Sequence, residues 1–294
     1  MVSTSTFKLK HLPKLLVKTY KNWIDTEPFE LSAIVAYYAI LSLPALIVII
    51  LNLVGNIWGK EIVQGELLDE ITNTVGIQTA EVIRVMMLDR GDETISLFTS
   101  IIGIATLLYG STSVFYQLQS AFDKIWQVET SKSNGIIRVI LSRIKSFGFI
   151  LIIGFLMLIS FVLTTLLSAF SRRIDRFVPD NWFELVYVFD FLTSILFIYL
   201  LFGAMFKYLP SNPVRWKAVK IGAALTSILF VIGKYLLAWY FNTMEPGSTY
   251  GAAGSVILIM LWVSYSSLIL FFGAHFTKVY SNVYLTKTES ITEK

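Results

Sequence analysis

The chain has 294 residues, of which 55% are hydrophobic and 15% charged, and its mean hydropathy is +0.68. A soluble domain carries about 25% charged residues, so this composition excludes an ordinary soluble protein, and its 22 Phe exclude a disordered one. The formal net charge is +4 and there is no cysteine, which excludes disulfides, thiol nucleophiles and thiolate metal sites. Because His11 and His275 are the only histidines, we also expect no metal centre.

Apolar stretches in chain order predict six transmembrane helices, because about 20 apolar residues cross the bilayer core. Four stretches contain no charged residue, namely 31–59, 94–122, 146–171 and 246–277. Two more contain a single charge each, Asp190 in 185–206 and Lys234 in 221–244. The expected fold is therefore all-α, a polytopic membrane protein with a six-helix bundle. Its spans lie near 32–55, 95–116, 147–170, 185–206, 220–241 and 254–276.

The distribution of basic residues predicts the orientation, because Lys and Arg are retained on the cytoplasmic side. The segments 1–31, 117–146, 207–220 and 277–294 hold 17 of the 24 Lys and Arg residues. Both termini are therefore expected in the cytoplasm, with the first span as the insertion signal and no cleaved signal peptide.

Three regions outside the spans have distinct patterns. In residues 1–30, apolar residues recur at helical spacing opposite lysines: Leu12, Leu15, Leu16, Tyr20 and Trp23 against Lys10, Lys14, Lys18 and Lys21. This pattern predicts a cytoplasmic basic amphipathic helix that suits the anionic inner leaflet, or alternatively a docking site for a partner or a lipid headgroup. Residues 60–90 predict an outer helical hairpin within the transmembrane domain 31–281. The eight acidic residues of the loop 56–94, which contains this hairpin, are interpreted as a solvated face rather than a cation site. Residues 282–294 are expected to form a cytoplasmic tail.

Ionisable residues inside a span are costly and indicate function by default. Asp190 and Lys234 are predicted at similar depth with opposite charge, so they are expected to pair if their helices face each other. The pair is interpreted either as part of an ion or headgroup pathway, or as a neutral pair that holds the bundle together. A lysine that snorkels to the interface alone is a further alternative.

Other polar and helix-breaking residues fall inside the predicted spans. Pro44 lies in the middle of the first span and leaves the carbonyl of Ile40 without its helical donor. Hydroxyls in spans one, two and six line a polar cavity or bind helices together, and both interpretations stay open. The pathway candidates among them are Tyr38, Ser42, Ser111 and Tyr265. Gly222 and Gly233 in span five permit close contact between helix backbones.

Several segments resemble a known family. They are AYYAILSLPAL (36–46), LQSAFDKIWQV (118–128), KYLPSNPVRWKAVKIGA (207–223), GKYLLAWY (233–240), YGAAGSVILIMLW (250–262) and FFGAHFTKVYS (271–281). Their order and spacing resemble the YihY/virulence factor BrkB family of bacterial inner-membrane proteins, over nearly the full chain. The resemblance implies a six-helix bundle with cytoplasmic termini. His275 stands where the family's GAEFT-like motif usually carries an acidic residue, so proton coupling by that carboxylate does not carry over. His275 is interpreted as a titrating substitute or as an interfacial histidine with one hydrogen bond.

Two functions follow as hypotheses. The first is a transporter or flippase-like carrier of a lipid or amphipathic substrate, without ATP hydrolysis because the chain has no P-loop. The second is a non-catalytic envelope scaffold or accessory membrane protein. Members of the family have carried a ribonuclease label, but a nuclease needs an aqueous basic groove and metal-binding carboxylates, which the short inner loops lack. We therefore expect no enzyme, cofactor or nucleic-acid partner. The expected partners are membrane lipids, the lipid-like or amphipathic substrate and a second copy of the chain.

Overall fold

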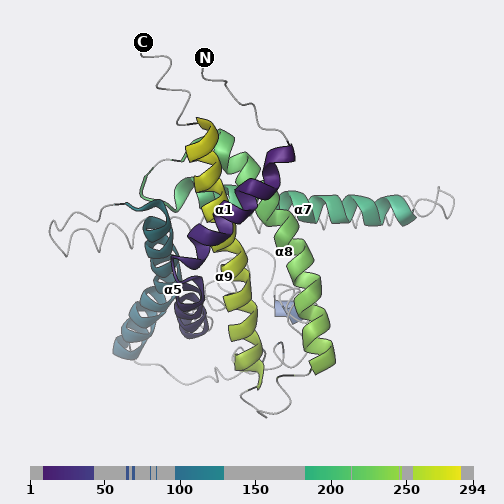
Figure 1. Cartoon of the computed structure of the whole chain (residues 1–294). Helices are drawn as coiled ribbons and strands as arrows, with labels where there is room; N and C mark the ends of the chain where they lie inside the picture. Colours follow the sequence, from purple (N-terminus) through teal and green to yellow (C-terminus); the bar gives the residue numbers. More distant parts are fainter. Residues whose placement is uncertain are drawn as a thin grey trace.

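The computed structural model describes residues 9–42, 64–65, 68–69, 80, 84, 97–128, 183–212, 214–244, 246 and 254–285. Every regular element in these residues is a helix, and none of them forms a strand, as the all-α prediction requires. The elements are η1 (Leu9–His11), α1 (Leu12–Ile24), α5 (Leu97–Trp126), α7 (Phe183–Tyr208), α8 (Trp216–Met244), α9 (Gly254–Tyr280) and a π-helical turn, η4 (Ser281–Leu285) (Figure 1). A further helix covers Pro28–Ser42.

Two of these helices are long and apolar enough to cross a membrane, Trp216–Met244 and the continuous stretch Val256–Leu285. Pro28–Ser42 and Ser194–Tyr208 are shorter apolar helices. The described chain is thus that of a helical membrane protein with two clear spans. The predicted span at 147–170 lies outside the described residues, as do Pro44 and most of the predicted hairpin at 60–90.

The buried core gathers where the C-terminal ends of α5, α7 and α9 meet the start of α8. Phe122 of α5 is at its centre, with its ring centroid 6.0 Å from that of Phe206 and 6.4 Å from that of Phe271. Val219 of α8 is fully buried in the same cluster. Close packing of such large side chains supplies many dispersion contacts, which stabilise this end of the structure.

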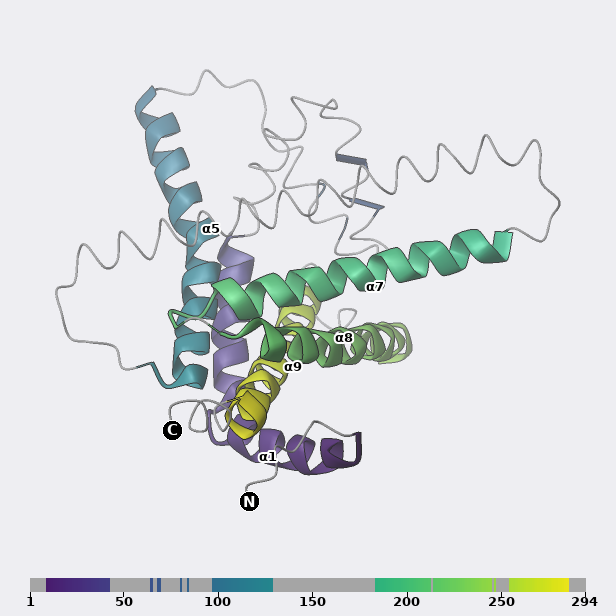
Figure 2. The same cartoon turned by 90° about the horizontal axis from the view of Figure 1, so that it is seen from above.

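α8 and α9 run antiparallel and touch most closely at this end. A Cβ added to Gly222 would lie 2.9 Å from the Cβ of Thr277, and one added to Gly273 would lie 2.9 Å from the Cβ of Thr226. The two helices therefore interlock through two matching glycine–threonine contacts, a small-residue interface of the kind that brings membrane helices together. Away from this end the helices diverge (Figures 1 and 2).

Candidate functional site

The last turn of α5 binds two other segments through its own backbone and side chains. Gln127 adopts a left-handed conformation with φ of 53°, and the N–H groups of Gln127 and Val128 donate to the carbonyls of Lys124 and Asp123 at 3.2 and 3.0 Å. This is a Schellman ending, which satisfies carbonyls that a helix C-terminus would otherwise leave free. The carbonyl of Ile125 instead accepts a 2.7 Å hydrogen bond from Lys278 Nζ of α9. An ammonium group also interacts favourably with the negative end of the helix dipole.

The turn between α7 and α8 is fastened to the same place. The carboxylate of Asp123 accepts hydrogen bonds from the backbone N–H and the hydroxyl of Ser211, at 2.8 and 2.7 Å. The turn is thereby held against α5, so the start of α8 has a defined position relative to α5 and α9.

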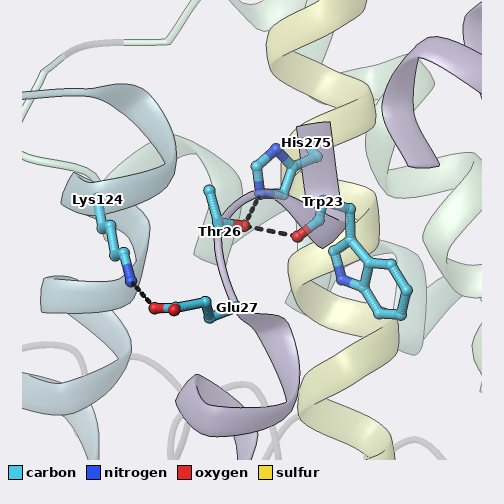
Figure 3. Close-up of polar contacts among 5 residues, drawn as sticks. All are labelled: Trp23, Thr26, Glu27, Lys124 and His275. Carbon is cyan, nitrogen blue, oxygen red and sulfur yellow. Dashed lines mark hydrogen bonds and ion pairs between the residues drawn. The ribbon is translucent and has the colours of Figure 1, made fainter. Parts of the chain in front are cut away.

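His275 connects α9 to the segment after α1. Its side chain is 2% exposed, and its Nε2 lies 2.9 Å from the hydroxyl of Thr26, which in turn lies 2.8 Å from the carbonyl of Trp23 (Figure 3). Because a carbonyl only accepts, the single proton of the Thr26 hydroxyl is directed to Trp23. His275 must then donate from Nε2–H, which leaves Nδ1 of the neutral ring as an acceptor. This Nδ1 is buried and has no hydrogen-bond partner among the described residues.

One ion pair lies beside this contact. Lys124 Nζ of α5 is 3.4 Å from the Glu27 carboxylate, and both side chains are exposed (Figure 3). An exposed ion pair contributes less than about 1 kcal/mol to the stability of a fold, so this pair adds little to the attachment of α5 to the segment after α1. We call this group of contacts the junction. Its members are Thr26, Glu27, Asp123, Lys124, Ser211, His275 and Lys278.

A narrow groove, with no internal space for a water molecule, lies between the diverging halves of α8 and α9, away from the junction. Its lining combines apolar side chains with three polar ones: Phe230, Leu237, Trp262 and Ile269 with Lys234, Tyr265 and Ser266. The Tyr265 ring approaches α8 because Gly233 has no side chain there; an added Cβ would lie 2.9 Å from the Tyr265 hydroxyl. Lys234 is half-buried, and no acidic side chain in the described chain pairs with it.

The structure brings together two of the predicted site residues, Lys234 and Tyr265, both in the groove. His275 belongs to the junction at the other end of α9. Ser42 is buried and donates to the carbonyl of Ala39 at 3.0 Å, and Tyr38 is half-buried against Tyr37. The expected close backbone contact is confirmed for Gly222, which faces Thr277, whereas Gly233 faces only the side chains of Ile269 and Tyr265.

For two of the remaining candidates the structure describes only the backbone, and a third lies outside the described residues. Asp190 lies in α7 and Ser111 in α5, but their side chains are outside the description, and Pro44 is outside the described residues. The pair of Asp190 with Lys234 therefore stays a prediction. In the described ranges, no three His, Asp or Glu side chains gather into a group that would hold a metal ion.

Comparison with known proteins identifies the family. A family model described as Virulence factor BrkB matches residues 19–293. The chain belongs to the virulence factor BrkB family. Relatives with the name UPF0761 membrane protein include one from Glaesserella parasuis, 22% identical over 189 residues that make up 64% of each chain. One from Methylibium petroleiphilum is 25% identical over 177 residues, which are 59% of this chain and 40% of that protein.

A third relative, from Mannheimia succiniciproducens, is 30% identical over 94 residues, which are 32% of this chain and 33% of the other. The chain thus covers less than two thirds of the length of these BrkB-family relatives. No solved structure matches it.

Some residues of this BrkB-family protein that the structure makes important had not been singled out. They include Thr226, Gly273 and Thr277 of the interlock, and Thr26 and Lys278 of the junction. A signal was present for the interlock, since GAALT (222–226) and GAHFT (273–277) repeat the spacing Gly-x-x-x-Thr. No comparable signal marks Thr26, whose role depends on a partner 249 residues away.

Proposed function

We propose that this BrkB-family protein is a transporter or flippase-like carrier that moves a lipid or amphipathic substrate across the bacterial inner membrane without ATP hydrolysis. The observation that carries the proposal is the groove with Lys234. A lysine inside an apolar span costs up to about 2.5–3.5 kcal/mol on insertion scales, so Lys234 favours a functional interpretation. The ammonium group and the hydroxyls of Tyr265 and Ser266 suit an anionic headgroup, while the apolar walls suit acyl chains.

The proposed topology has six spans with both termini in the cytoplasm. The position of the basic segments supports it. The end of α5, the α7–α8 turn and the end of α9 are the regions rich in Lys and Arg, and they meet at the junction. His11 and Tyr284, near the two ends of the described chain, also contact each other, with His11 Nδ1 3.0 Å from the Tyr284 hydroxyl. In the proposed topology the junction is the cytoplasmic end and the groove belongs to the outer half.

The divergence of α8 and α9 supports a pathway that opens sideways to the bilayer. A substrate would enter the groove between the two helices and exchange its headgroup contacts with Lys234 and Tyr265. Asp190, Tyr38, Ser42, Pro44 and Ser111 remain the candidates for the rest of the pathway, with His275 at its inner end.

The test is reconstitution of the full chain into liposomes with fluorescent phospholipids, with and without a pH or Na⁺ gradient. We expect labelled lipid to change leaflet faster than in empty liposomes, and Lys234→Met to slow this several-fold. Lys220→Met is the matched control because Lys220 lies exposed on the same helix outside the groove.

Equal rates of lipid transfer for Lys234→Met and the natural chain would show that the groove is not the transport site. If neither lipid nor small solutes move faster than in empty liposomes, the transporter proposal fails and a non-catalytic envelope scaffold is favoured.

A further inference from the structure

The face of α1 that the sequence suggested for the membrane is occupied by protein. Leu15 is buried in the core cluster, and the Trp23 ring packs edge-on against Phe272 of α9 with centroids 5.8 Å apart. Thr26 fixes the end of this segment to His275. The leucine face of α1 therefore binds α9 and is not available to lipid.

A second apolar stripe on α1 is exposed instead. Val17, Tyr20 and Ile24 have exposed fractions of 58%, 55% and 40%. Their spacing of three and four residues puts them on one face of the helix. We call this the exposed stripe, and it lies beside the leucine face, not on it.

The exposed stripe is bordered by a row of lysines. Lys10, Lys14, Lys18 and Lys21 are all exposed and share a face by the same spacing, next to the stripe. No acidic residue occurs between Leu9 and Ile24, so this side of α1 carries four uncompensated positive charges.

The exposed stripe continues into the first predicted span. Tyr20, Trp23 and Phe29 form a chain of ring contacts with centroid distances of 6.0 and 5.8 Å. On the Pro28–Ser42 helix, Phe29, Tyr37 and Leu41 are exposed at intervals of four or eight residues, on one face. Tyr and Trp are enriched where a membrane protein crosses the boundary between headgroups and acyl chains.

We propose that the exposed stripe of α1 and the row of lysines beside it form a binding surface for anionic phospholipid of the inner leaflet. The four lysines contact headgroup phosphates, while Val17, Tyr20 and Ile24 contact the upper acyl chains. Charge complementarity and continuity with the exposed face of the first predicted span favour a lipid surface over a nucleic acid, because a polyanion in water offers nothing to the apolar stripe. Through Thr26 and His275, the lipid-bound helix is attached directly to α9.

The first experiment measures how deeply two positions on α1 lie in the membrane. Since the natural chain has no cysteine, single variants Val17→Cys and Lys14→Cys carry one spin label each at a known place. The full chain is reconstituted in vesicles of phosphatidylcholine with about one third phosphatidylglycerol. We expect the label at 17 to be relaxed mainly by oxygen, which partitions into acyl chains, and the label at 14 mainly by a water-soluble nickel chelate. If both labels respond to the nickel chelate alike, the stripe faces water and the proposal is wrong.

The second experiment measures headgroup preference, by the ratio of phosphatidylglycerol to phosphatidylcholine retained on the purified full chain. The double variant Lys14→Gln/Lys18→Gln is compared with Lys217→Gln/Lys220→Gln, which removes two exposed positive charges from α8. We expect the α1 variant to lower the ratio about five-fold or more and the α8 variant less than two-fold.

An equal loss in both variants would mean that bulk charge alone attracts the lipid, and it would overturn the proposal. Displacement of the bound phosphatidylglycerol by single-stranded RNA at equal phosphate concentration would overturn it in favour of a nucleic-acid surface. Neither readout involves transport, so both are independent of the proposed carrier function.

Discussion

At the junction end, α8 and α9 approach so closely that only glycine fits between them. In their far halves the same two helices separate (Figure 1). The narrow groove lined by Lys234 and Tyr265 lies there. At the near end, each glycine receives a threonine whose hydroxyl is already used within its own helix. Thr226 donates to the carbonyl of Gly222 at 2.7 Å, and Thr277 to that of Gly273 at 2.8 Å. The interlock therefore buries no unpaired hydroxyl.

The far halves have a different composition. Large apolar side chains such as Ile232, Leu236 and Trp239 are exposed there, and Lys234 stands among them. The same helix pair is therefore in backbone contact at one end and in contact through long side chains at the other. An interlock of backbones leaves no alternative arrangement, while long side chains can repack.

The largest expected effect comes from filling the interlock. Gly222→Ala and Gly273→Ala would each place a methyl group against the opposing threonine, whose own position is set by its backbone. We expect each to lower the free energy of unfolding by about 2–3 kcal/mol, the cost of overpacking a tight contact. Thermal unfolding in detergent measures it. Gly203→Ala is the matched control, because its Cβ would meet only Ala223, at 3.9 Å. If all three variants melt alike, the interlock does not fix the near end.

A smaller effect is expected from the junction. Thr26→Val keeps the shape of the side chain but removes both of its hydrogen bonds and leaves the His275 ring without a partner among the described residues. We expect a loss of about 1–2 kcal/mol, the cost of an unsatisfied buried polar group. Faster proteolysis of the α1 segment should accompany it. Thr26→Ser retains the hydroxyl and should be as stable as the natural chain. If Thr26→Ser loses as much free energy of unfolding as Thr26→Val, the methyl group and not the hydrogen bond is responsible.

In the far half, the same type of change is expected to cost less. A Cβ on Gly233 would meet only the outer ends of the Ile269 and Tyr265 side chains, at 2.7 and 2.9 Å. These side chains can turn away, and alanine gains about 1 kcal/mol of helix propensity over glycine. Gly233→Ala should therefore change the melting temperature much less than Gly222→Ala. A loss of equal size would mean that the far half is as tightly fixed as the near end.

The smallest effect is expected from the exposed ion pair. Lys124→Met should change the free energy of unfolding by less than about 0.5 kcal/mol, because both partners are solvated. The difference should disappear at about 1 M salt, where the Debye length is roughly 3 Å. Melting curves at low and high salt measure this. A large loss that salt does not remove would show that Lys124 does more than pair with Glu27.

Much of the helical structure could be predicted from the sequence. The ranges near 220–241 and 254–276 correspond to α8 and α9, because a run of apolar residues is a local property of the chain. Gly222 was recognisable as a close contact, but its partner Thr277 was not, since hydropathy carries no information about which face meets which. The leucines of α1 were correctly recognised as one apolar face. Whether that face meets lipid or protein depended on α9, more than 200 residues later.

The sequence by itself therefore determined that this is a membrane protein of the BrkB family, with apolar helices and basic segments between them. These properties are sums over neighbouring residues. Only the tertiary structure decided that His275 binds Thr26, that Lys234 and Tyr265 share a groove, and that the exposed side of α1 is a different face from its leucines. Each of these depends on the relative position of helices that are far apart in the chain, and packing, not local pattern, sets that position.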